Sequence, residues 1–184
     1  MRFPPIPEDQ WSEAQASVAN AIKSGPRGQL RGPFVPLLYS PELAACVQKT
    51  GEYIRFRNSL PDDLIEMAVL MTARHYNCAN MWESHRALAI KANLSHGIIS
   101  ELSLKKEPDG MSLDEQLIFN FCSELLNTSF VSSKTFDAAK QRFGKRGAID
   151  ITGLCGYYTL LSLVFNVSEI PLEATSTPFE GCSP

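Results

Sequence analysis

An acid, a thiol and an imidazole lie close together near the middle of the chain, and their types suggest proton-handling chemistry. Glu66 is followed after eleven intervening residues by Cys78 and after six more by His85. If Asn77 caps a helix, Cys78 and His85 fall on nearly the same helical face. A cysteine in the first helical turn lies near unpaired backbone N–H groups, which favour the thiolate. The three residues therefore predict a site that transfers protons.

Glu66 lies in segment 64–71, which is otherwise made of apolar residues. A helix this apolar is expected to be buried nearly all round, so the carboxylate needs a partner inside the protein. Imidazole is the obvious neighbour. The alternative is a structural ion pair with Arg74 or Arg86.

The spacing of Glu66, Cys78 and His85 resembles the motif of the carboxymuconolactone decarboxylase and alkylhydroperoxidase D superfamily. Segments 31–34 (Arg-Gly-Pro-Phe) and 40–43 (Ser-Pro-Glu-Leu) resemble the N-terminal region of its longer members. The resemblance covers about residues 30–170. It implies an all-α fold, an alkylhydroperoxidase D-like helical bundle, and a homo-oligomer such as a dimer, trimer or hexamer.

The sequence departs from the peroxidase branch of that superfamily at one important point. That branch carries a Cys-x-x-Cys pair at the helix start, but here the second cysteine is replaced by Met81, and the usual tyrosine by Asn80. The decarboxylase branch lacks the cysteine pair. The resemblance therefore favours the decarboxylase type.

Length and composition predict one domain with a proper core, because the chain has 184 residues and 44% hydrophobic content. We divide it into an N-terminal helical arm and linker (1–30), a core (31–167) and an extended tail (168–184).

Charge and cysteine usage limit the expected partners and location. The net charge is −3, with acidic and basic residues interspersed, so neither nucleic acid nor a membrane is an expected partner. With no signal-like N-terminus and five scattered cysteines, a reducing, cytoplasmic location is expected. Cys46, Cys122 and Cys155 are interpreted as small core residues.

Caps and periodicity predict a chain of helices with no strands. The expected helices cover about residues 7–24, 40–57, 61–75, 78–92, 95–102 and 112–127, one more from 132 or 133, and a last apolar helix over 148–165. That last helix is expected to be central or to form an oligomer contact. In helix 112–127, a core-facing stripe is predicted at Leu113, Leu117, Phe121 and Leu125.

Several residues could complete a binding pocket around the trio. Arg31 could anchor a substrate carboxylate, because a guanidinium can donate two parallel hydrogen bonds to its oxygens. Phe34, Trp82 and Tyr157 could wall an apolar cavity, although aromatic residues at helical spacing are more often plain core. Tyr157 and Tyr158 are not expected both to face inward.

No metal or cofactor is expected, since His75 and His96 lack the spacing of known metal-binding helices. Three hypotheses follow for the function. The first is a decarboxylase-like lyase acting on a small carboxylated ring or lactone through His85 and Glu66. The second is a thiol-dependent peroxidase that uses Cys78, and the third is a non-catalytic oligomer that binds a small molecule.

Overall fold

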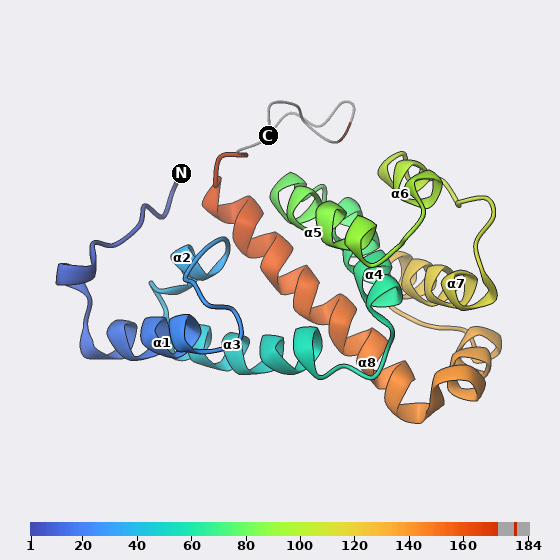
Figure 1. The fold of residues 1–184 in the computed structure, drawn as a ribbon, viewed down its shortest axis with the longest axis horizontal. Helices are drawn as coiled ribbons and strands as arrows, with labels where there is room; N and C mark the ends of the chain where they lie inside the picture. Colours follow the sequence, from blue (N-terminus) through green and yellow to red (C-terminus); the bar gives the residue numbers. More distant parts are fainter. Residues whose placement is uncertain (173–178, 180–184) are drawn as a thin grey trace.

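The computed structural model describes residues 1–172 and residue 179, and over this part of the chain the fold is all-helical (Figure 1). A 3-10 helix, η1 (Glu8–Gln10), precedes eight α-helices. They are α1 (Glu13–Ser24), α2 (Phe34–Leu37), α3 (Pro41–Phe56), α4 (Asp62–His75), α5 (Ala79–Lys91), α6 (His96–Ser103), α7 (Leu113–Thr128) and α8 (Ser133–Ser168). The all-α prediction is confirmed.

Local sequence signals set most helix starts. Ser12 and Ser112 each form a reciprocal capping box at the start of α1 and α7, and Ser95 and Ser132 cap α6 and α8 through their side chains. The helix predicted to begin at residue 7 begins at Glu13 instead, because the Ser12 capping box starts it there after the separate short turn η1.

Helix α8 runs diagonally through the molecule, and the other helices are arranged around it (Figure 1). Its two parts meet at Gly144, whose φ of 72° and ψ of 175° are non-helical. Glycine adopts this conformation without a steric penalty. Helix α8 packs against α2, α3, α4, α5 and α7, so the predicted apolar helix is central.

By length and composition alone, α8 is apolar enough to cross a membrane. However, 56% of its most apolar window is buried inside the protein. Such burial against neighbouring helices is typical of a core helix.

The stripe predicted on α7 is wrong at its first position. Leu113 is 87% exposed, whereas Ile118, Phe121 and Cys122 are buried. Leu113 is the first residue of the helix, and the buried residues lie on a face centred about one position away from the predicted stripe.

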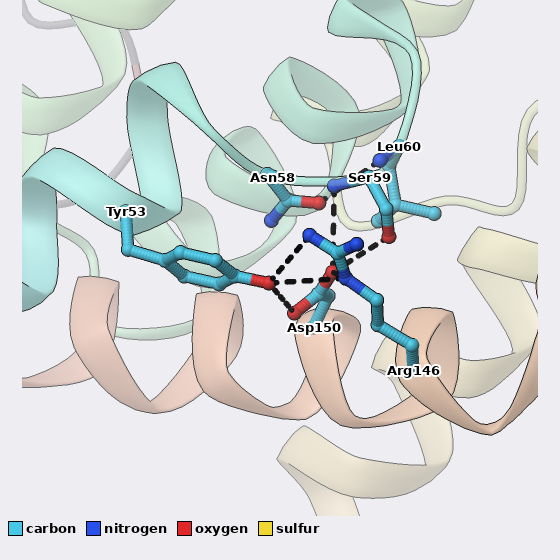
Figure 2. Close-up of polar contacts among 6 residues, drawn as sticks. All are labelled: Tyr53, Asn58, Ser59, Leu60, Arg146 and Asp150. Carbon is cyan, nitrogen blue, oxygen red and sulfur yellow. Dashed lines mark hydrogen bonds and ion pairs between the residues drawn. The ribbon is translucent and has the colours of Figure 1, made fainter.

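A buried carboxylate joins α8 to the α3–α4 connection (Figure 2). Asp150 is 5% exposed and accepts hydrogen bonds from the Tyr53 hydroxyl (2.9 Å) and from the Ser59 hydroxyl (2.6 Å) and backbone N–H (3.3 Å). The Arg146 guanidinium lies 3.7 Å from the carboxylate. These bonds satisfy the carboxylate inside the protein and fix the direction in which the chain enters α4.

The cysteine predictions are confirmed at two positions and wrong at one. Cys122 and Cys155 are buried, with their sulfur atoms 3.6 Å apart. Cys46 is exposed, because it lies on the solvent side of α3.

Part of the predicted extended tail, 173–178 and 180–184, lies outside the described residues. Within the rest of that range, Ser168 still belongs to α8, and Phe179 is buried at 2% exposure.

Candidate active site

The site forms where α4, α5 and α8 meet. Glu66 lies on the otherwise apolar α4, and His85 lies on the inward face of α5. The predicted burial of α4 is confirmed, since nine of its residues, from Leu64 to Ala73, are buried. This helix therefore holds the carboxylate of Glu66 inside the protein.

Glu66 and His85 form a direct pair. The Oε2 atom of Glu66 lies 2.6 Å from Nδ1 of His85, and the two side chains are only 13% and 6% exposed. The suggested alternative pairs with arginine are wrong. Arg74 donates to the Ser103 backbone oxygen, and Arg86 pairs with Glu83.

The pairing determines which edge of the imidazole is available for chemistry. With Nδ1 facing Glu66, Nε2 is left without a hydrogen-bond partner among the described residues. The Tyr158 ring packs edge-on against the His85 ring, with centroids 5.0 Å apart. The carboxylate and the tyrosine together fix the position of the imidazole.

His85 and Tyr158 line a cavity of about 660 Å³ between α5, α8 and the segment before α2. Arg27, Arg31 and Arg55 also line it, and Glu83 is its one lining carboxylate among the described residues. Since Glu83 is already paired with Arg86, the cavity has an excess of positive charge. Such a cavity favours an anionic ligand.

Both ends of the described chain border this cavity. Met1 and Pro5 line it, as do Ile170, Pro171 and Leu172. The two ends are tied together where the Arg2 backbone N–H donates to the Ser168 oxygen at 2.8 Å. The Asn80 side chain holds the C-terminal segment through the Ile170 oxygen at 2.9 Å.

The thiolate expected at Cys78 is not supported. Cys78 is the N-cap of α5 and not a first-turn residue, and it is 1% exposed. Burial raises the pKa of its thiol to about 11, although the nearby Met81 backbone and Ser162 hydroxyl oppose this shift. Asn77, expected as the cap, has a positive φ of 50°. Cys78 does not line the cavity.

The predicted wall residues divide into two groups. Phe34 is buried and lines the cavity, and Arg31 lines it from an exposed position. Trp82 does not line it, because its ring packs against Phe179 with centroids 5.3 Å apart. Tyr157 is also absent from the lining and accepts a hydrogen bond from Arg27 instead.

The expectation that Tyr157 and Tyr158 cannot both face inward is wrong. They are 6% and 1% exposed, and their rings meet edge-on. Both are buried because α8 is central and has protein on two sides. Burial raises the pKa of both phenols.

Sequence reasoning missed Arg27, Arg55 and Tyr158 as pocket residues. Arg27 lies in the same Gly- and Pro-rich segment as Arg31, so a search for cations in that loop could have found it. No local pattern marks Arg55, which approaches the pocket only because α3 packs against α8.

No protein-family model matches the chain, and no curated protein matches it either. The case for its function therefore rests on the geometry of the site.

Proposed function

We propose that the protein is a decarboxylase-like lyase that acts on a small carboxylated ring or lactone, with His85 as its proton donor and acceptor. The observation that carries this proposal is the Glu66–His85 pair at 2.6 Å, beside a cavity lined by three arginines. An imidazole backed by a carboxylate suits proton transfer, and arginine suits a carboxylate ligand.

The proposed reaction begins with a substrate carboxylate held by the pocket arginines. Breaking the bond between the substrate carbon and its carboxylate releases CO2, and the electron pair stays on the substrate as an enolate-type anion. Protonated His85 then donates the Nε2 proton to carbon. Glu66 stabilises the imidazolium form through Nδ1, and the positive cavity stabilises the developing anion.

The observations do not favour a thiol peroxidase. A peroxidatic cysteine attacks as its thiolate and must be reachable by peroxide. Cys78 is buried, its thiol has a raised pKa, and it does not line the cavity. Met81 offers no resolving thiol at the motif position.

The wider setting that accompanies this proposal is a cytoplasmic homo-oligomer with an alkylhydroperoxidase D-like bundle. The exposed face of α8 is the surface that supports self-association. Leu163 and Val167 are 50% and 52% exposed there, and Ile149 is 70% exposed. Asp150, the one charged residue between 148 and 168, is buried, so this face presents no charge.

Turnover of carboxymuconolactone tests the proposal. The wild-type protein should release CO2, and His85→Asn, which keeps a side-chain donor of similar size, should abolish the release. A protein that binds the compound tightly without turnover would be the non-catalytic binder instead.

A further inference from the structure

We infer that Arg27 is the residue that anchors the substrate's anionic group, and that Tyr157 and Gly51 are positioning residues that hold its guanidinium in place. This inference rests on the proposed function, since it names the anion anchor of the same cavity. The sequence had suggested Arg31 for that role.

The three cavity arginines share a feature that separates them from most others in the protein. Four of the six other arginines have carboxylate partners: Arg2 with Glu169, Arg86 with Glu83, Arg142 with Asp114 and Arg146 with Asp150. Arg27, Arg31 and Arg55 have no ion pair among the described residues, although all three line the cavity. Their charges are therefore available to a ligand.

Arg27 alone among the three is held by buried neighbours. Its Nε donates to the Gln48 side-chain oxygen at 2.6 Å, and its Nη2 donates to the Tyr157 hydroxyl at 2.9 Å. Gln48 and Tyr157 are 4% and 6% exposed. Glu52 lies one step farther away, where it accepts from the Gln48 amide at 3.2 Å. Both direct partners of Arg27 are thus neutral, and they orient its charge without cancelling it.

The ring of Phe34 completes the support. The guanidinium carbon of Arg27 lies 4.6 Å from the ring centroid. This stacking restricts the plane of the guanidinium. A guanidinium carries five N–H donors, of which the protein uses two here, so three remain. The unused donors lie on Nη1 and Nη2, the edge that can grip both oxygens of a carboxylate.

Gly51 provides the space for this arrangement. A Cβ atom at this position would lie 2.1 Å from the Tyr157 hydroxyl oxygen and 2.3 Å from Nη2 of Arg27. Gly51 lies inside α3, where glycine is a poor helix former. The close approach of Arg27 and Tyr157 explains why glycine occupies a position that α3 alone would not favour.

The inference predicts that the cavity distinguishes an anion from a neutral molecule of the same shape, and that Arg27 is responsible. We would titrate the full-length protein with benzoate, with benzamide and with inorganic phosphate by isothermal calorimetry. Wild-type protein should bind benzoate at least about 10-fold more tightly than benzamide. A preference for phosphate over benzoate would overturn the assignment to a carboxylate.

Variants then identify the residue that produces the preference for benzoate over benzamide. In Arg27→Gln the benzoate affinity should fall about 10- to 100-fold, so that the ratio to benzamide approaches unity. The exposed Arg31→Gln should change that ratio less than about threefold, and Arg57→Gln, which lies outside the cavity lining, should leave it unchanged. Gly51→Ala should lower the ratio although residue 51 does not line the cavity, and circular dichroism would confirm that the variant is folded.

A second measurement avoids dependence on any one folded variant. In Arg27→Ala, added ethylguanidinium should restore part of the benzoate affinity, because it supplies the missing guanidinium group. An unchanged benzoate-to-benzamide ratio in Arg27→Gln would overturn the inference. That outcome differs from a failure of the proposed function, which would appear as CO2 release that is absent from the wild-type protein or unchanged in His85→Asn, with the benzoate preference unaffected.

Discussion

Cys78 should react with hydrogen peroxide much more slowly than an ordinary cysteine. The thiolate is the reactive form, and burial moves the pKa of this thiol from 9.0 to about 11. Each pKa unit changes the thiolate fraction tenfold near neutral pH, so a shift of about two units leaves about 100-fold less thiolate. With the side chain 1% exposed, restricted access should slow the reaction further.

The assay compares the same cysteine in the folded and unfolded chain. Protein is exposed to substoichiometric peroxide in buffer or in concentrated urea, then quenched, digested and analysed by mass spectrometry. In urea, Cys78 should oxidise at the rate of a free cysteine. In buffer its rate should be at least about 100-fold lower and should rise with pH toward the pKa near 11. Folded-state oxidation as fast as that in urea would refute this reasoning and revive the peroxidase hypothesis.

Three further predictions test other parts of the structure. Glu66→Gln should lower kcat for carboxymuconolactone about 10- to 100-fold with little change in KM, because the imidazolium of His85 loses its charged partner. A rise in KM of about 10- to 100-fold with kcat unchanged would show that Glu66 serves substrate binding instead. Asp150→Asn should lower the free energy of unfolding by about 1.5–3 kcal/mol in urea titrations, since the buried carboxylate accepts three hydrogen bonds; an unchanged value would show that this cluster adds nothing to stability. Leu163→Glu should reduce the mass of the assembly in light scattering, because it places a charge on the apolar face of α8; a wild-type monomer would show that the predicted homo-oligomer is wrong.

Local sequence signals were sufficient to predict every α-helix except the short α2, although the two parts of α8 were predicted as separate helices. Serine caps and Pro41 marked helix starts within a few residues, since capping depends on residues adjacent in the sequence. The boundary between α7 and α8 was also marked by serine. Gly144 was not recognised as a kink, because its unusual φ depends on how the two parts of α8 pack.

The Glu66–His85 pair was predictable because an apolar helix leaves a carboxylate few possible partners. The state of Cys78 was not, because a position at a helix start suggested a stabilised thiolate, whereas burial by distant residues determined the pKa. Arg27 and Tyr157 are separated by 129 intervening residues, and no local pattern connects them. This contact follows only from the way the loop after α1 packs against α8.

The most direct test of the proposed function is turnover of carboxymuconolactone in D2O by wild-type protein and by His85→Asn. Wild-type protein should release CO2 and place deuterium from the solvent on the product carbon, because a protonated side chain completes the reaction. His85→Asn should be slower by at least about 100-fold, as expected for the loss of a general acid. Equal rates and equal deuterium incorporation in the two proteins would contradict the role of His85 and, with it, the proposed function.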